Sequence, residues 1–278
     1  MNKNITIKKI IIFTIYIVSI ICIVFLVRNV IFDVNRKSFG SVKLVTEYDE
    51  NTTIDDMETV TFGSYPQSDI TGNIKEPIEW IVLDRQENKC LLLSKYILDC
   101  KCYDDRGNKN TWETCSLRNW LNEKFYNIAF NNDEKNKIIN STVINNDNMN
   151  YILGSCNYTC DNVFLLSIID MREYFGNGTK IDSYTYQLGK KVTTEGTEYA
   201  KSVFNISNYL DVYNEIGIDD DEYQKYNWAF GNSPFWLRSP GDYSNFATFV
   251  NCAGGMDMNG TYVYVSDFGV RPALWVSY

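Results

Sequence analysis

The chain has 278 residues, 45% of them hydrophobic, which is enough to bury a core in one large domain or two small ones. Of its 26 basic and 35 acidic residues, 20 basic and 34 acidic ones follow residue 37, so this stretch has a net charge of −14. Such a surface repels phosphate backbones, so no nucleic acid partner is expected, and the absence of histidine excludes Ser-His and Cys-His nucleophiles and most catalytic zinc sites.

An apolar segment lies close to the N-terminus. Residues 10–27 are 18 consecutive residues without a charge, and the apolar character continues beyond them, which predicts a transmembrane helix over 10–31 behind a short cytoplasmic tail, 1–9. The bulky sequence Phe25-Leu26-Val27-Arg28 does not fit a signal-peptide cleavage site, and Ile21 before Cys22 does not fit a lipoprotein. We therefore expect an uncleaved, single-pass anchor.

The orientation of this anchor follows from its flanking charges. Lys3, Lys8, Lys9 and the amino terminus on one side slightly outweigh the basic residues on the other, where Asp33 offsets part of the charge. We therefore expect a protein of the cell membrane that holds its C-terminal domain outside the cell. Residues 32–57 are polar and acidic without helical periodicity, which predicts a stalk before a domain over 58–278.

The first half of the outer domain contains predicted strands followed by helices. Strand formers predict strands at Val60–Phe62, Ile78–Leu83 and Cys90–Leu93, with a turn over Asp84–Lys89. A helix follows, with Ser116 as its predicted N-cap. Its apolar stripe consists of Leu117, Trp120, Leu121 and Phe125.

Shorter elements are predicted further along the chain. Asp133 is the predicted N-cap of a short helix that ends near Ile139, and residues 163–166 (VFLL) are typical of a strand. Ser167 and Asp170 have capping-box spacing at the start of another helix, and residues 197–204 are expected to be helical. Helices between two sets of strands indicate an α+β fold.

The last 44 residues contain the closing strands and two arginines. A strand runs through Phe235 into Arg238, followed by turn chemistry at 239–241, and alternation predicts a strand at 246–250. Strand formers also fill 262–265, and Gly269-Val270 leads into Arg271. The loops between these strands, roughly 241–245 and 253–260, are where we expect function.

Seven blocks in this order resemble a known family. They include FGSYPQSD (62–69), PIEWIVLD (77–84), TWETCSLRNWLN (111–122) and, in the tail, WLRSPG and GVRPAL. Together they resemble the bacterial domain of unknown function 6273, which is distantly similar to the C-type-lectin and formylglycine-generating-enzyme fold group. The resemblance implies a C-type-lectin-like mixed sheet with flanking helices and long loops. It also implies a structural role for the motif residues Trp80, Trp120, Trp236, Arg238, Gly269 and Arg271.

The cysteines do not indicate a catalytic site. Formylglycine-generating enzymes use a cysteine pair near their C-terminal motif, whereas only Cys252 lies in that region here, so no catalytic residue is predicted. Seven cysteines lie outside the apolar segment, and disulfides, reduced thiols and a metal site all remain open. Cys252 itself is typical of a small core residue.

A polar and aromatic surface is expected near the C-terminus, because Tyr, Ser and Asn supply adaptable contacts at binding surfaces. Its candidate ligand-binding residues are Asp242, Tyr243, Asn245, Asn251, Asp257, Asn259 and Tyr262, with Ser244 and Tyr264 beside them. The run from Asp257 to Gly260 resembles part of a calcium loop, although two oxygen ligands fall short of one and both residues also suit a turn. Calcium is the one cofactor this pattern suggests, and no other metal site is expected.

These features predict a membrane-anchored, extracytoplasmic domain that binds a protein or glycan ligand and has no evident catalytic site. An oxidase-like enzyme related to the formylglycine-generating group, using Cys252, is one alternative. A structural module associated with the cell envelope is another.

Overall fold

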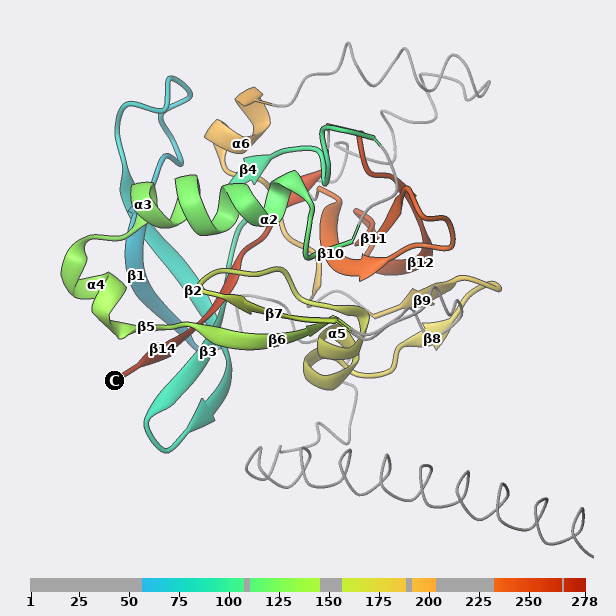
Figure 1. Cartoon of the computed structure of the whole chain (residues 1–278), viewed down its shortest axis with the longest axis horizontal. Helices are drawn as coiled ribbons and strands as arrows, with labels where there is room; N and C mark the ends of the chain where they lie inside the picture. The colour runs from blue at the N-terminus through green and yellow to red at the C-terminus, as the bar shows by residue number, and fades with distance from the viewer. Residues whose placement is uncertain (1–56, 108–110, 146–156, 189–191, 204–232, 267) are drawn as a thin grey trace, which may run out of the picture. The chain divides into compact units, whose positions relative to one another are not determined.

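A computed structural model of the chain describes residues 57–107, 111–145, 157–188, 192–203, 233–266 and 268–278 (Figure 1). Among these residues no helix is long and apolar enough to cross a membrane. The predicted tail (1–9), transmembrane helix (10–31) and all but the last residue of the predicted stalk (32–57) lie outside the described residues. The described residues are Met57 and most of the domain predicted over 58–278.

The first sheet has five strands in the order β1-β2-β3-β14-β5, and all its pairs are antiparallel. Its central strands are the apolar runs of the sequence, and Leu91–Leu93 of β3 are buried. The C-terminal strand β14 lies between β3 and β5, so the two ends of the domain share one core. The strands are β1 (Thr59–Tyr65), β2 (Glu76–Gln86), β3 (Lys89–Ser94), β5 (Ile138–Ile139) and β14 (Ala273–Ser277).

The second sheet has seven strands in the order β4-β13-β10-β11-β12-β9-β8. It is mixed, because β10 and β13 pair in parallel while its other pairs are antiparallel. A separate two-stranded ribbon pairs β6 (Ser141–Asn145) with β7 (Asn157–Asp161). The seven strands are β4 (Asp99–Cys100), β8 (Thr179–Lys180), β9 (Thr185–Gln187), β10 (Phe235–Pro240), β11 (Phe246–Val250), β12 (Gly255–Tyr262) and β13 (Gly269–Val270).

One continuous helical run follows β4 and lies beside β1 (Figure 1). It consists of α2 (Ser116–Trp120), a π-helical turn, η2 (Leu121–Phe125), and α3 (Tyr126–Ala129). Leu117, Leu121 and Phe125 are buried, as the predicted stripe requires, whereas Trp120 is only partly buried. The predicted N-cap, Ser116, is wrong by one residue: the thiol of Cys115 accepts the Arg118 N–H at 3.3 Å.

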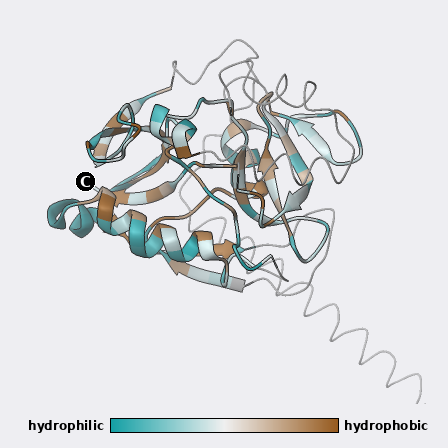
Figure 2. Cartoon of the chain, turned by 90° about the horizontal axis from the view of Figure 1, so that it is seen from above, coloured by the Kyte–Doolittle hydropathy of each residue, from teal (hydrophilic) through white to brown (hydrophobic). Residues whose placement is uncertain are grey.

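The remaining helices are short. Helix α4 (Asn132–Lys137) is hydrophilic throughout (Figure 2), and Asn131 caps it in place of Asp133 because the Asn131 carboxamide accepts the Glu134 N–H. The predicted capping box of Ser167 and Asp170 is confirmed at the start of α5 (Ile168–Phe175). Helix α6 spans Glu198–Val203, close to the prediction.

Three strand predictions need correction. The strand β2 continues to Gln86, so the turn before β3 is shorter than residues 84–89. Residues 163–166 form only a single bridge, between Phe164 and Ala273, and the carbonyls of Leu165 and Leu166 accept instead from the guanidinium and the backbone N–H of Arg238. The strand β12 ends at Tyr262, where the predicted strand 262–265 begins, and most of the predicted loop 253–260 belongs to β12.

The mixed α+β prediction is thus confirmed by the two sheets and their helices. Trp80 of β2 and Trp236 of β10 are both fully buried, and each indole N–H donates to a backbone carbonyl, of Phe62 and of Lys101. Their burial in a common apolar cluster makes the core continuous between the sheets.

Candidate functional site

The candidate site lies on the part of the second sheet built from β10, β11 and β12. Phe246 and Tyr262 are register partners on neighbouring antiparallel strands, so their side chains share one face. Their rings are 4.5 Å apart. Tyr243 contacts Phe246 at 5.1 Å, and Tyr264 stacks on Tyr262 at 5.1 Å. These four residues form the aromatic row.

The aromatic row is open to solvent at both ends. The exposed fraction is 61% for Tyr243 and 41% for Tyr264, while Phe246 and Tyr262 between them are partly buried. Burying large aromatic rings stabilises both cores and interfaces, so rings aligned in contact and left exposed are typical of a contact surface. Tyrosine suits such a surface because it offers an apolar face and a polar tip at low entropic cost.

Three carboxylates lie beside the aromatic row and come from three segments: Asp182 between β8 and β9, Asp242 after β10, and Asp257 within β12. They are close enough for the charges of Asp182 and Asp242 to raise the pKa of Asp257, which burial raises more strongly. Among the described residues none of the three forms an ion pair with Lys or Arg, so we name them the unpaired carboxylates. Backbone N–H groups, and less strongly the charge of Lys180, lower the pKa of Asp182.

The backbone holds these carboxylates in place. Asp257 Oδ1 accepts the N–H groups of Asn259 and Gly260 at 2.9 and 3.1 Å, which forms a tight turn at a bulge in β12. Gly260 has a φ of +78°, which only glycine adopts easily. The Asn259 carbonyl accepts the Asp242 N–H at 2.8 Å, which joins the loop after β10 to this bulge.

The structure brings most of the predicted ligand-binding residues together. Asp242, Tyr243 and Asn245 lie in the loop before β11, and backbone hydrogen bonds join this loop to Asn259 and Val263. Tyr262 pairs with Phe246, whereas Asp257 lies opposite Phe249 and within reach of the charge of Asp242. Asn251 lies at the opposite end of the β11–β12 hairpin, where its side-chain oxygen closes the turn by accepting the N–H groups of Ala253 and Gly255. Sequence reasoning missed Asp182 and Phe246, because only the register of β9, β11 and β12 places them here.

The carboxylate of Asp257 forms part of a turn in this structure. Its Oδ1 is already used by two backbone N–H groups, as in a turn. In the part of the chain that the structure describes, no three Asp, Glu or Cys side chains converge closely enough for a metal ion.

The two arginines of the tail are buried and face away from solvent. Arg238 donates to the carbonyls of Leu165 and Ile144 and pairs with Asp170 at the first turn of α5. Its guanidinium therefore connects β10 to the helix and to the β6–β7 ribbon.

Arg271 makes a different set of contacts. Within the described residues its guanidinium donates hydrogen bonds to carbonyls only, of Ser94 at 2.9 Å, Val192 at 2.9 Å and Lys95 at 3.5 Å. It also lies over the Phe235 ring at 5.1 Å. Burial lowers the pKa of Arg271 to about 9, which still leaves it protonated at neutral pH. The guanidinium groups of both arginines are therefore occupied by contacts within the domain.

The other motif residues lie in tight packing. Trp236 stacks on Phe268 at 4.4 Å, and the Trp120 ring receives the ammonium group of Lys101 at 4.5 Å. A Cβ at Gly269 would lie 2.6 Å from the Ile97 side chain, so this position has no room for a larger residue.

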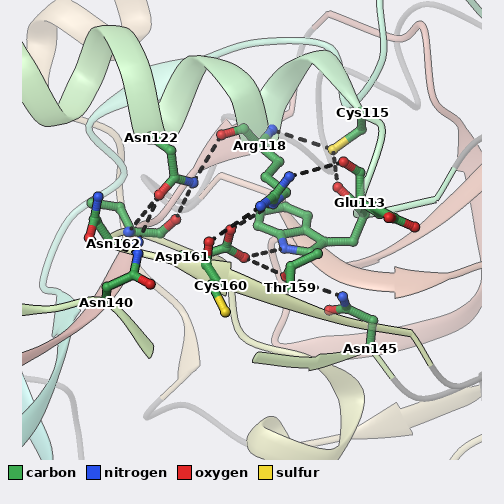
Figure 3. Close-up of polar contacts among 12 residues, drawn as sticks. Glu113, Cys115, Arg118, Asn122, Asn140, Asn145, Thr159, Cys160, Asp161 and Asn162 are labelled. Atoms are coloured by element: carbon green, nitrogen blue, oxygen red, sulfur yellow. Dashed lines mark hydrogen bonds and ion pairs between the residues drawn. The ribbon is translucent and has the colours of Figure 1, made fainter. Parts of the chain in front are cut away.

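A polar network that sequence reasoning missed lies beneath α2 (Figure 3). Asp161, at the end of β7, is fully buried and accepts from Arg118 Nε at 2.6 Å, from the Trp112 indole at 2.9 Å and from the Thr159 hydroxyl at 2.7 Å. Arg118 also donates to the carbonyls of Glu113 and Cys160. The block TWETCSLRNWLN contains both Trp112 and Arg118 and was the feature of the sequence that could have indicated this network.

Burial disfavours the thiolate form of Cys115 and Cys252. Cys90, Cys102, Cys115 and Cys160 are not in disulfides in the described structure. Burial raises the pKa of Cys115 to about 12 and also raises the pKa of Cys252. A raised thiol pKa disfavours the thiolate that nucleophilic and oxidative chemistry requires.

The fold and this face define a mixed α+β domain with an exposed aromatic row and buried arginines. The chain belongs to the family described as domain of unknown function (DUF6273), whose sequence model matches residues 87–278. The matched range begins after β2, although β1 and β2 pair into the same sheet as β3. Neither the search of curated proteins nor the search of solved structures found a match.

Proposed function

We propose that this protein is a membrane-anchored binding protein whose outer domain recognises a protein or glycan ligand through the aromatic row. The proposed anchor is the apolar segment 10–31, and the proposed location of the domain is outside the cell. The observation that carries the proposal is the exposed row of contacting rings next to carboxylates that form no ion pair among the described residues.

The proposed fold relation is to the C-type-lectin-like group. Its support is the mixed sheet, the long connections and the position of the aromatic row on the closing strands β10 to β12. Lectin-fold variable proteins use a comparable C-terminal region for recognition. The two tail arginines fit this proposal as parts of the framework beneath the binding face.

Two observations weigh against the alternative of an oxidase-like enzyme. The chain has no histidine, and the pKa of the Cys252 thiol is raised by burial. An envelope-associated structural module would also use an exposed contact surface, so it differs from the proposal only in what the surface holds.

The proposed membrane topology is tested by protease shaving of intact cells that express the full chain. Release of the C-terminal domain into the medium is the expected result. Protection of the domain until the membrane is permeabilised would contradict the extracytoplasmic location.

Binding at the aromatic row is tested by placing a photo-crosslinking residue in the full chain on intact cells. The variant is Tyr264→benzoyl-Phe, and the matched control is Tyr158→benzoyl-Phe, because Tyr158 is also an exposed tyrosine, at 71%, but lies on β7. We expect a discrete adduct of reproducible mass from position 264 and none from position 158. Equal adducts at both positions, or none at either, would contradict the proposed binding face.

A further inference from the structure

The charge around the aromatic row indicates which ligand it fits. We infer that the row binds an extended segment of a partner protein that presents Lys or Arg side chains. This inference rests on the proposed function and narrows the ligand to a basic peptide. Three properties of the face support it: its charge, its rings and its length.

The first property is an imbalance of charge. Asp182, Asp242 and Asp257 lie close together, and no lysine or arginine of the described residues forms an ion pair with them. Asp242 Oδ1 is also buried without a hydrogen-bond donor among the described residues. A carboxylate oxygen removed from water without a donor is costly, and a donor from a ligand would remove that cost.

Nearby cations of the chain do not balance the three carboxylates. Arg106 follows Asp104 and precedes Gly107, where a Cβ would lie 3.3 Å from the Tyr264 ring; it pairs with the buried Asp104 at 3.1 Å and donates to the Thr114 carbonyl. Lys180 faces the ring of Tyr186 at 5.9 Å, and its charge adds to the backbone N–H groups that lower the pKa of Asp182. The net charge of the face is therefore negative, and it complements a cation.

The second property is the chemistry of the rings. An ammonium or guanidinium group is attracted to the face of a tyrosine ring, and this attraction grows when carboxylates stand nearby and water is displaced. The protein uses the same contact internally, where Lys101 lies over Trp120 at 4.5 Å and Arg172 over Tyr186 at 4.6 Å. The exposed tyrosines next to the unpaired carboxylates offer a basic side chain of a ligand the same kind of cation–ring contact.

The third property is the length of the row. Its successive ring centroids are 5.1, 4.5 and 5.1 Å apart. Four rings in successive contact exceed the size of a single small cation and offer contacts to several residues of an extended peptide, which advances about 3.3 Å per residue. A neutral sugar would also stack on tyrosine, but it would leave the three carboxylates without a counter-charge.

The test measures binding of defined probes to the full chain in nanodiscs of zwitterionic lipid, which does not itself attract basic peptides. The probes are a fluorescent Lys-Gly-Lys-Gly-Lys peptide, the same peptide with Glu in place of Lys, and neutral oligosaccharides. The variants are Tyr264→Ala and the double variant Asp242→Asn with Asp257→Asn. Asn retains an oxygen for the turn at Asn259 and Gly260.

The matched controls are Tyr158→Ala and Asp133→Asn, an exposed tyrosine and an exposed carboxylate away from the row. We expect the lysine peptide to bind with strong salt dependence, and each row variant to weaken it about tenfold while the controls leave it unchanged. Equal weakening by Asp133→Asn would reduce the binding to general attraction by an acidic protein and overturn the inference. A thermal melt of each variant verifies that it is folded.

The two proposals fail in different ways. Binding of a neutral oligosaccharide that Tyr264→Ala abolishes and the double Asn variant leaves intact would overturn the basic-peptide inference and keep the binding function. If no probe binds while the crosslink at position 264 still forms, the inference is overturned and the proposed face stands. Absence of both the crosslink and any row-dependent binding would overturn both.

Discussion

The domain contains two kinds of carboxylate, and their surroundings are opposite. Asp161 and Asp170 are held by arginines: Asp161 by Arg118 and Asp170 by Arg238. Asp242 and Asp257, by contrast, lie beside the aromatic row, and within the described residues no cation pairs with them.

The difference teaches which acidic groups hold the fold together. A buried charge costs several kcal/mol unless it is paired and hydrogen-bonded, and Asp161 satisfies both conditions with three donors. Among the unpaired carboxylates, Asp182 and Asp257 satisfy only the hydrogen-bond condition, through backbone N–H groups, and Asp242 Oδ1 has no donor among the described residues. We therefore expect the first kind to be essential to stability and the second to be dispensable for it. Of the four variants below, Arg118→Met and Asp257→Asn test this contrast directly, while Arg271→Met and Tyr65→Phe measure other buried polar contacts for comparison.

The largest loss of stability is expected for Arg271→Met. The side chain is 1% exposed, and its removal leaves the carbonyls of Ser94, Val192 and Lys95 without this donor. Each buried group that loses its partner costs about 1–3 kcal/mol, so we expect unfolding to become easier by roughly 4 kcal/mol. Chemical denaturation of the solubilised full chain measures this change in the free energy of unfolding. Arg85→Met, at an exposed ion pair with Glu58, is the control, and an equally small shift for both would contradict this assignment.

The second largest loss is expected for Arg118→Met, which leaves the buried carboxylate of Asp161 without its cation. Breaking a buried pair from one side typically costs about 3 kcal/mol. The additional variant Arg118→Met with Asp161→Asn should recover part of this loss, because it removes the uncompensated charge. Urea unfolding of the two variants measures the recovery. If the free-energy losses of Arg118→Met and Asp161→Asn simply add in the double variant, the two residues act independently, which would contradict the expected recovery.

A smaller loss is expected for Tyr65→Phe. The Tyr65 hydroxyl donates to the buried Asp99 at 2.7 Å, and Lys101 is the only other charged partner of that carboxylate among the described residues. Loss of one hydrogen bond to a carboxylate should cost about 1.5 kcal/mol. Tyr126→Phe is the control, since no hydrogen bond of its hydroxyl is found in the described structure. Equal melting midpoints for the two variants would rule out a stabilising role of the hydroxyl.

The smallest effect, and one of opposite sign, is expected for Asp257→Asn. Burial and two neighbouring carboxylates raise the pKa of Asp257 in the folded protein, so its ionised form opposes folding at neutral pH. The variant should be more stable than the parent by about 0.5 kcal/mol at pH 7, measured by thermal unfolding. As the pH falls through the raised pKa, the parent binds a proton and the difference should shrink, and it should vanish below the pKa of the unfolded chain. A difference that grows on acidification would contradict the sign of the shift.

Local patterns predicted much of the framework. The capping box of Ser167 and Asp170 needs only neighbours in sequence, and both residues occupy the predicted positions. The apolar runs of β2 and β3 were likewise visible, because burial requires a continuous apolar segment. The errors arose at helix ends, where a single residue sets the first position of the helix. Cys115 caps α2 although thiols are uncommon caps, whereas N-cap preferences favoured the adjacent Ser116.

The strand predicted at residues 163–166 shows a different limit. Its composition is typical of a strand, and Phe164 does make one bridge. The carbonyls of Leu165 and Leu166 are bonded to Arg238, which is more than 70 residues away in sequence. Strand propensity describes which structure a segment can form. Here hydrogen bonds to a distant residue decided which structure it does form.

The candidate site likewise has features that the sequence shows and features that only the tertiary structure decides. The sequence determined the residue types of the closing strands, their tyrosines and aspartates, the acidic balance and the absence of histidine, because these are properties of composition and local order. Only the tertiary structure decided that Phe246 joins the tyrosines, that Asn251 is separated from them, and that Asp182 lies near Asp257. Strand register and the pairing of charges depend on contacts between distant segments. For that reason the sequence could not distinguish the aspartates that hold the fold from those that lie beside the aromatic row.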